Sequence, residues 1–213
     1  KAFSTTLLGM GTVFALLIVI IFGRKIIDFL RRKQIGEEVR DLGLEGQLQK
    51  RGTPTMGGLC FIFGILVTLG LVWGMFHNQL PEVLGLPQMK AGMMVLFLAF
   101  GSGLIGFLDD FIKVIKHRNL GLTEAQKMIL QIALTFGFMF GLNSLGLLTT
   151  QVQLPIFGLV DMGLVYYPIA FFGIIFLVNA VNLTDGLDGL CTSVTILVAT
   201  FFTIVAIGEN SGI

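Results

Sequence analysis

Charged residues and cysteines are both scarce in this sequence of 213 residues. Asp, Glu, Lys and Arg together make up 13% of the chain, whereas a soluble domain carries about 25%, so the composition excludes an ordinary water-soluble fold. The two cysteines, Cys60 and Cys191, lie in separate apolar runs, which argues against a disulfide framework and a CxxC metal site. The two histidines, His77 and His117, are isolated from each other, and we expect neither to bind a metal.

Hydrophobic residues dominate instead, at 54% of the chain, with 20 Phe and 28 Gly. A helix that crosses about 30 Å of hydrocarbon needs about 20 mostly apolar residues. Six stretches qualify, some more clearly than others, and they predict an all-α polytopic membrane protein with about six transmembrane helices in a single domain over residues 1–213. The expected spans are residues 4–27, 56–76, 91–112, 127–148, 166–184 and 190–208.

Lysine and arginine residues are concentrated in two of the connections between these spans. Residues 24–51 hold eight of the fourteen, and residues 113–127 hold four. Because cytoplasmic loops of membrane proteins are enriched in Lys and Arg, we expect both connections, and the break after the fifth span, to face the cytoplasm. Trp73, Tyr166 and Tyr167 then fall at the outer ends of spans, where aromatic belts form.

The outer connection at residues 149–165 has β-branched residues around Pro155 and Gly158. Alternation of this kind is typical of a short β-hairpin, which would lie over the outer face of the protein. An irregular loop explains the same residues equally well, so both interpretations stay open.

Two adjacent aspartates stand at the end of the third span. Asp109 and Asp110 follow an apolar run without a turn signal, so we expect the helix to continue through them. Lys113 then lies four and three residues further on, within one helical turn of both acids. Ionisable residues at membrane depth are expensive and usually functional. We therefore favour a functional acidic cluster over a solvated helix end with an ordinary ion pair.

A second polar cluster follows the fifth span at residues 179–188. Asn179 and Asn182 share a helix face because they are three residues apart, and Asp185 follows where glycines open the backbone. Carboxylate and amide oxygens suit a hard cation such as Mg²⁺, which keeps several waters and bridges substrate phosphates. A tight turn between two helices uses the same residue types, but four Asn and Asp residues exceed what a turn needs.

A basic and glycine-rich segment, Lys50 to Gly58, immediately precedes the second span. Lys and Arg pair with phosphate, and hydroxyls with backbone amides near a helix start add donors for an anion. Taken alone, this segment is explained equally well as a positively charged anchor at the inner interface. Acids for a divalent cation and bases for phosphate on one face favour a reaction between a phosphorylated lipid and a soluble phosphorylated substrate.

Three motifs carry a resemblance to a known enzyme family. They are KRGTPTMGG at residues 50–58, GFLDDFIKV at 106–114 and NAVNLTDGLDGL at 179–190. In this order they resemble the phospho-N-acetylmuramoyl-pentapeptide transferases, the MraY family, and the similarity spans nearly all of the chain. LTDGLDG and the Asp pair are shared with the wider superfamily of polyprenyl-phosphate N-acetylhexosamine-1-phosphate transferases. RGTPTMGG points to the muramoyl-pentapeptide branch.

The resemblance implies an enzyme of peptidoglycan synthesis in the bacterial inner membrane, with its active site on the cytoplasmic side. It would transfer phospho-MurNAc-pentapeptide from UDP-MurNAc-pentapeptide to undecaprenyl phosphate in a Mg²⁺-dependent step that gives lipid I and UMP. It further implies a homodimer among membrane lipids, no nucleic-acid partner, and a nucleoside antibiotic as a possible ligand over residues 186–188.

The resemblance also implies roles for the residues at matching positions. Asp109, Asp110, Lys113 and Asp185 would be catalytic, with Asp109 the better candidate for deprotonating the lipid phosphate and Lys113 holding phosphate. Asp110 and Asp185 would contribute to a metal site. The implied substrate-binding residues are Lys50, Thr55, Asn179, Asn182, Gly186, Leu187, Asp188 and Lys127.

One departure from the family pattern concerns length. Family members have about ten spans, with a metal-binding aspartate and a His-rich motif in later cytoplasmic loops, whereas this chain ends at Ile213 after the sixth expected span. We therefore expect the N-terminal part of a longer protein, inactive by itself, with a main metal ligand beyond residue 213. The alternatives are a prenyl-phosphate GlcNAc-1-phosphate transferase and, in a different class, an ion-coupled membrane transporter.

Overall fold

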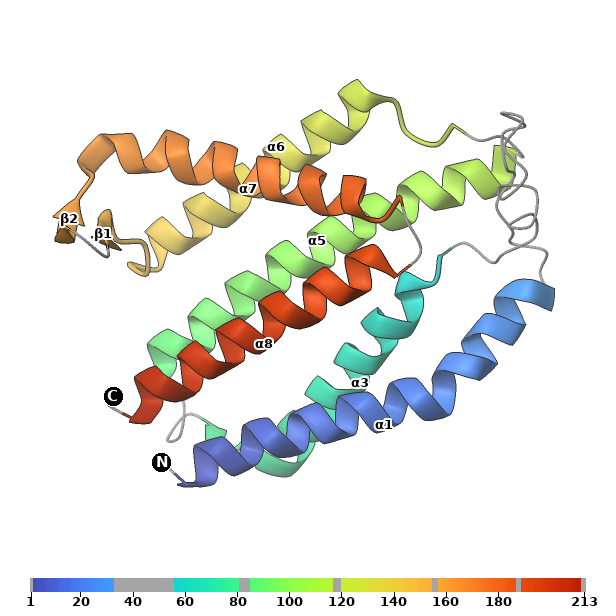
Figure 1. Ribbon diagram of the computed structural model, residues 1–213, viewed down its shortest axis with the longest axis horizontal. Helices are drawn as coiled ribbons and strands as arrows, with labels where there is room; N and C mark the ends of the chain where they lie inside the picture. The colour runs from blue at the N-terminus through green and yellow to red at the C-terminus, as the bar shows by residue number, and fades with distance from the viewer. Residues whose placement is uncertain are drawn as a thin grey trace. The chain divides into compact units, whose positions relative to one another are not determined.

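The computed structural model describes residues 2–32, 56–80, 85–116, 120–154, 157–186 and 189–211. Helices make up most of this part of the chain, as Figure 1 shows. In chain order the elements are α1 (Ala2–Arg32), α3 (Gly58–Phe76), α5 (Leu86–Lys116), α6 (Glu124–Ser144), β1 (Gln151–Leu154), β2 (Gly158–Asp161), the 3₁₀ turn η1 (Gly163–Val165), α7 (Tyr166–Thr184) and α8 (Leu190–Ser211).

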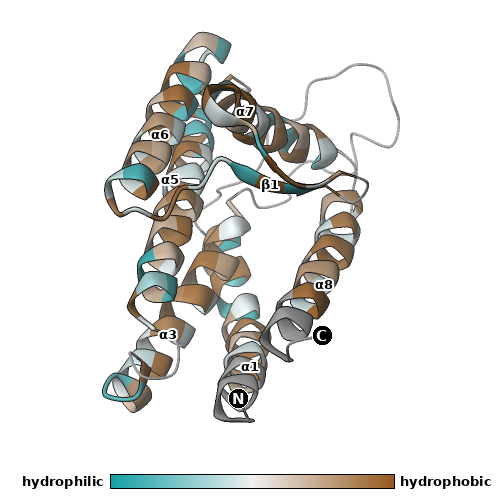
Figure 2. Ribbon diagram, turned by 90° about the vertical axis from the view of Figure 1, so that its left-hand side faces the viewer, coloured by the Kyte–Doolittle hydropathy of each residue, from teal (hydrophilic) through white to brown (hydrophobic). Residues whose placement is uncertain are grey.

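The helices confirm the expected class of polytopic helical membrane protein. Each of the six expected spans corresponds to one helix. Within the described ranges, α3, α5, α6 and the segment Gly163–Thr184 are long and apolar enough to cross a membrane, and the apolar part of α8, Leu190–Val205, is shorter. Figure 2 shows how brown, hydrophobic residues run along these helices.

The position of α6 corrects the prediction for the fourth span. The helix covers Glu124–Ser144 rather than residues 127–148. It ends early because Gly146 adopts a left-handed conformation with φ of 66°, and the amide of Leu147 donates to the carbonyl of Leu142 over 2.9 Å. This glycine-based helix end leaves residues 145–148 outside the helix.

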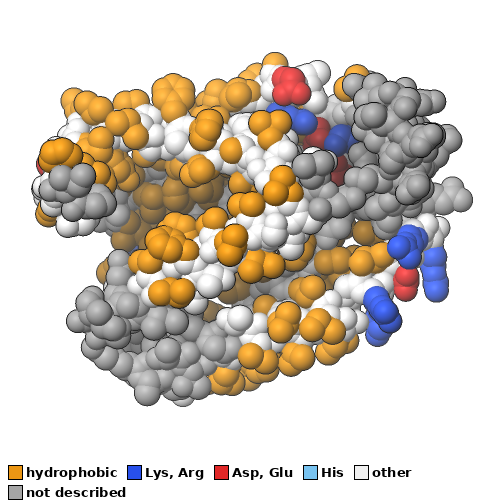
Figure 3. All heavy atoms as spheres, viewed as in Figure 1, with side chains coloured by type: hydrophobic (Ala, Val, Ile, Leu, Met, Phe, Trp, Pro, Cys, Tyr) orange, Lys and Arg blue, Asp and Glu red, His pale blue; other side chains and the backbone are white. Residues whose placement is uncertain are grey.

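Large apolar side chains cover the outer surface of the helices. Phe172 and Leu197 are 67% and 72% exposed, and few apolar residues are buried in the described part of the chain. In Figure 3 orange side chains cover the helix bodies, whereas blue and red side chains lie near helix ends. Such a surface is suited to contact with lipid hydrocarbon rather than water. Apolar side chains there meet lipid tails, and the helices satisfy their backbone polar groups internally.

The chain forms two units, residues 6–131 and residues 132–213 with 1–5, and each is described by itself. In the first unit, α1 and α3 pack in antiparallel directions. Phe22 and Phe63 meet edge to face with ring centres 5.5 Å apart, and the thiol of Cys60 lies 4.0 Å from the carbonyl of Gly23. Small residues thus allow the two helices to approach closely, as is typical in membranes.

Gly64 occupies the tightest part of this contact. A Cβ atom added there would lie 2.7 Å from Val19 Cγ2, so we expect Gly64→Ala to destabilise the protein by about 1–3 kcal/mol through overpacking. Thermal unfolding in detergent measures the loss, and adding Val19→Ala should restore most of it. Gly70→Ala is the matched control on α3, because nothing lies within 4 Å of its added Cβ. Equal losses in the Gly64 and Gly70 variants would contradict the packing explanation.

In the second unit, β1 and β2 form an antiparallel hairpin, which is one of the two interpretations left open for residues 149–165. Gln151 pairs with Asp161, and Leu154 pairs with Gly158, so the irregular-loop alternative is wrong for these residues. The Thr150 hydroxyl and the Gly163 amide donate to the Asp161 carboxylate, over 2.5 Å and 2.9 Å, and lower its pKa. The hairpin directly precedes η1 and α7 in the chain.

Candidate active site

The last two turns of α5 carry the predicted acidic cluster. The helix continues through the Asp pair to Lys116, as expected from the absence of a turn signal. Lys113 Nζ lies 2.8 Å from Asp109 Oδ2 and 3.0 Å from Asp110 Oδ1. The i,i+4 and i,i+3 spacings in the sequence therefore produce a single ammonium group held by two carboxylates.

Asp109 also binds the beginning of α6. Its Oδ1 atom accepts the amide hydrogen of Leu122 over 2.8 Å and an ion pair from Lys127 Nζ over 3.1 Å. Both carboxylate oxygens of Asp109 thus face charged or polar donors, and the residue is only 8% exposed. Lys127, which the sequence places in the substrate-binding set only through the family resemblance, joins the acidic cluster through this contact.

The charges of this cluster balance. Asp109 and Asp110 contribute two negative charges, and Lys113 and Lys127 contribute two positive charges. A buried carboxylate requires such partners, because desolvating an unpaired charge costs several kcal/mol. The side chains of Lys113 and Lys127 are 35% and 27% exposed, so both are partly accessible to solvent.

A capping box fixes the start of α6 and so the position of Lys127. The Thr123 hydroxyl accepts the Gln126 amide hydrogen over 3.2 Å, and the Thr123 amide donates to Gln126 Oε1 over 2.9 Å. This reciprocal pair satisfies two amide donors that the first helical turn leaves unpaired. The T-x-x-Q pattern of Thr123 to Gln126 is present in the sequence, and it is the signal that predicts a helix start at Glu124.

The second predicted cluster lies at the end of α7 and belongs to the other unit. The helix ends at Thr184, and Asp185 and Gly186 form a turn. Asn179 Nδ2 donates to the carbonyl of Ile175 over 2.8 Å. This hydrogen bond to a carbonyl of the preceding turn of α7 orients the side-chain amide of Asn179.

Four predicted site residues, Lys50, Thr55, Leu187 and Asp188, lie outside the described residues. The described residues of the predicted site fall into two groups. Asp109, Asp110, Lys113 and Lys127 are in direct contact within the first unit. The second unit carries the rest, namely Asn179, Asn182, Asp185 and Gly186.

The acids meet part of what a Mg²⁺ site requires. Mg²⁺ binds through one or two carboxylates, with waters and substrate phosphates completing its six ligands, and the predicted pair Asp110 and Asp185 has this chemistry. Within the described ranges, no three His, Cys, Asp or Glu side chains gather as a metal-binding group. Asp109 is already engaged by two lysines, so it fits an ion-pair role better than a metal ligand.

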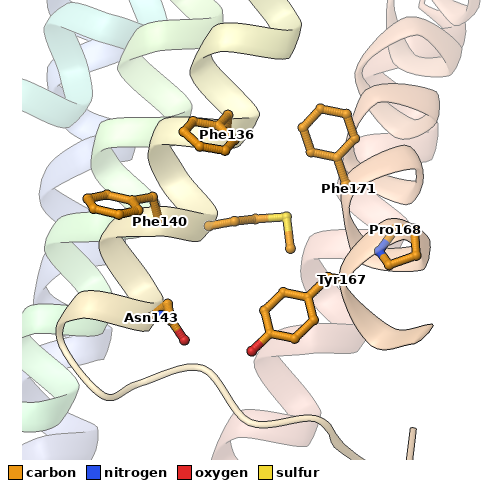
Figure 4. Close-up of a pocket in the computed structure, with 7 residues that line it drawn as sticks. Phe136, Phe140, Asn143, Tyr167, Pro168 and Phe171 are labelled. Carbon is orange, nitrogen blue, oxygen red and sulfur yellow. The ribbon is translucent and has the colours of Figure 1, made fainter. Parts of the chain in front are cut away.

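An apolar cavity of about 350 Å³ lies elsewhere, between α6 and α7 near the hairpin. In Figure 4 the aromatic rings surround it, and the polar ends of Asn143 and Tyr167 lie at one side. Phosphate recognition needs positive charge or several donors, and the lining contains no charged side chain. The cavity is therefore a poorer candidate than the Asp109 cluster. Its lining residues are Phe136, Met139, Phe140, Asn143, Tyr167, Pro168 and Phe171.

Comparison with known proteins agrees with the chemistry of the two polar clusters. The model of glycosyl transferase family 4 matches residues 92–212, more than half of the chain, and includes both clusters. The chain belongs to glycosyl transferase family 4. A shorter pattern, phospho-N-acetylmuramoyl-pentapeptide-transferase signature 1, matches residues 50–62. This signature covers the segment whose sequence pointed to the muramoyl-pentapeptide branch of the family.

Several similar proteins carry the same name as the signature. The chain is 40% identical over 200 residues to a phospho-N-acetylmuramoyl-pentapeptide-transferase of Clostridium perfringens, covering 92% of the chain and 57% of the relative. The corresponding enzyme of Clostridioides difficile is 43% identical over 193 residues, which cover 90% of the chain and 56% of the relative. That of Desulfitobacterium hafniense is 40% identical over 188 residues, which cover 88% of the chain and 53% of the relative. The expected resemblance is confirmed, and the chain spans little more than half the length of these relatives.

Proposed function

We propose that this protein transfers phospho-MurNAc-pentapeptide from UDP-MurNAc-pentapeptide to undecaprenyl phosphate, forming lipid I and UMP for peptidoglycan synthesis. The observation that carries the proposal is the match of residues 50–62 to the signature of these transferases. Relatives about 40% identical bear the same name along nearly all of the chain. The paired acids and lysines at the end of α5 supply chemistry suited to phosphate groups.

The proposed reaction exchanges one phosphoanhydride bond for another. An oxygen of the lipid phosphate attacks the phosphorus atom that bears the sugar, and the bond from that phosphorus to the bridging oxygen breaks. UMP leaves with the bonding electron pair. Negative charge therefore grows on the transferring and leaving oxygens, and positioned cations near them lower the barrier.

In this proposal Lys113 and Lys127 meet the substrate phosphates, and Asp109 holds their ammonium groups in place. Positioning suits Asp109 better than proton abstraction, because both of its oxygens already accept hydrogen bonds or ion pairs. A phosphate monoester has a second pKa of about 6, so the lipid phosphate is mostly a dianion at neutral pH. It can attack without transferring a proton to the enzyme.

The nucleotide side of the donor would be bound by the second cluster and the basic segment before α3. Amide and carboxylate groups at the end of α7 suit the hydrogen-bonding edge of uracil and the ribose hydroxyls. The lysine and threonine side chains suit the diphosphate. The residues assigned to these contacts are Lys50, Thr55, Asn179, Asn182, Asp185, Gly186, Leu187 and Asp188.

Asp110 and Asp185 are our candidates to hold Mg²⁺ in this protein. A bound Mg²⁺ would neutralise charge on the diphosphate and orient it. In the described part of the chain Asp110 pairs with one lysine, through Oδ1, whereas Asp109 pairs with two, so Asp110 suits this role better than Asp109 does. Waters and oxygens of the diphosphate would complete the six ligands that Mg²⁺ takes.

We place the site on the cytoplasmic side of a bacterial inner membrane. Support comes from the Lys and Arg bias of the connections after α1 and α5. A cytoplasmic site also matches the donor, because a charged UDP-sugar is soluble and does not cross hydrocarbon. The proposal extends to a homodimer and to competition by uridine-based antibiotics, both of which rest on family resemblance.

A test of two donors separates this function from its alternatives. The complete protein in detergent, with undecaprenyl phosphate and Mg²⁺, should release UMP from UDP-MurNAc-pentapeptide but not from UDP-GlcNAc. The reverse preference would assign the protein to the GlcNAc-1-phosphate branch of the superfamily. No release from either donor would reject the transferase and favour the ion-coupled transporter, which swelling or flux in proteoliposomes would then test.

A further inference from the structure

Gly121 lies against the buried aspartate of the site. It stands in the short segment between α5 and α6, is itself buried, and is the neighbour of the amide that donates to Asp109. A Cβ atom added at Gly121 would overlap Asp109 Oδ1 and the Asp109 carbonyl oxygen, and would lie 2.7 Å from Asp109 Cγ. The space beside Asp109 thus accepts a backbone without a side chain.

Beside this close approach, two donors reach the same carboxylate oxygen of Asp109. The Leu122 amide reaches Asp109 Oδ1 over 2.8 Å, on the same oxygen that pairs with Lys127 over 3.1 Å. Because one of the two overlapping atoms is a backbone carbonyl inside helix α5, the helix cannot move aside as a flexible side chain would. A larger residue at 121 must push the segment away from Asp109, and the Leu122 hydrogen bond lengthens or breaks.

We propose that Gly121 is a positioning residue of the transferase: it lets the 120–122 segment close on Asp109, which then aligns the ammonium groups of Lys113 and Lys127 for the transferring phosphate. The inference rests on the proposed function for its catalytic consequence and on contacts of the first unit for its geometry. Neither the acid pair nor the signature segment includes this residue.

Amide hydrogen exchange at Leu122 in the complete protein tests the geometric part of this proposal, namely the contact of the 120–122 segment with Asp109. The bond to a buried carboxylate should protect this amide, and Gly121→Ala should accelerate its exchange roughly tenfold or more, the expected loss for one hydrogen bond to a charged group. Asp109→Ala should do the same by removing the acceptor. Gly106→Ala on α5 is the matched control, because nothing lies within 4 Å of its added Cβ. Unchanged exchange in Gly121→Ala would overturn the proposal.

The catalytic half is tested by steady-state kinetics of UMP release. Gly121→Ala should lower kcat roughly tenfold or more, with the KM for the UDP donor within about twofold, because misaligned lysines weaken contacts made in the transition state. A purely structural role would instead lower the yield of folded protein and leave the kcat of the folded fraction unchanged. That result, or an equal kcat loss in Gly106→Ala, would reject positioning by Gly121.

If Gly121→Ala does not fold, a second pair of variants tests the same contact with Asp109. Leu122→Pro removes the amide donor, whereas Leu122→Ala shortens the side chain and keeps the donor. The proline variant should show the same fall in kcat, and the alanine variant should keep it within about twofold. Equal kcat values in the two variants would overturn the proposal. If the wild-type protein releases no UMP, the proposed function fails, and hydrogen exchange still decides whether Gly121 holds the contact.

Discussion

Exchange of Asp109 for asparagine is expected to lower the rate of UMP release by about 10²–10³-fold, the loss typical of removing one electrostatic contact to a transition state. The variant keeps the shape of the side chain but turns one charged acceptor into an amide donor. Its nitrogen must then face Lys113, Lys127 or the Leu122 amide, all of which are donors. The two lysines lose their common anchor, so the effect should appear mainly in kcat.

The same variant should lose stability, because two ammonium groups remain with too little negative charge. Breaking a buried ion pair costs about 3–5 kcal/mol, and partial exposure of both lysines places the expected loss at the lower end. Rates are therefore measured on the monodisperse fraction, with Glu124→Gln on α6 as the control, since Glu124 is exposed. An Asp109→Asn enzyme with a wild-type kcat would contradict the positioning of the lysines.

Replacing Lys113 by methionine is expected to reduce UMP release by about 10²-fold. Methionine retains much of the length and the apolar stem of lysine but has no charge, so Asp109 and Asp110 lose the ammonium group that they share. Lys116→Met is the matched control, because Lys116 lies on the same last turn of α5 and is exposed. We expect the control to keep its rate within about twofold.

Combining Lys113→Met with Lys127→Met separates two possible actions of the lysines. If both act on the same transferring phosphate through Asp109, the double variant should lose less than the product of the single losses. Rate losses that multiply fully would indicate independent contacts. Equal losses in the Lys113 and Lys116 variants would contradict a specific role for Lys113 and indicate a general effect of charge at this end of α5.

Local patterns in the sequence were sufficient for most of the fold. The apolar runs predicted six helices in the order observed, and the unbroken run before Asp109 predicted that the helix continues through the Asp pair, as α5 does. Alternating residues around Pro155 and Gly158 favoured the hairpin as much as a loop, and the observed register decides for the hairpin. These features depend on residues close together in the chain, for which length and periodicity carry the information.

Helix ends were predicted less well. The fourth span begins at Glu124 and ends at Ser144 because of the Thr123 capping box and the left-handed Gly146. Hydropathy alone cannot locate such ends, because they depend on hydrogen bonds of a few polar residues rather than on apolar length.

By itself the sequence predicted a helical membrane protein that resembles the MraY family, and it placed Asp109, Asp110 and Lys113 within one helical turn. Only the tertiary structure decided that Asp109 also binds the Leu122 amide and Lys127, and that Gly121 is the residue that permits this contact. The physical reason is distance along the chain. Helical spacing fixes which neighbours meet within a turn, whereas the approach of residues 120–122 to α5 depends on packing that no local period encodes.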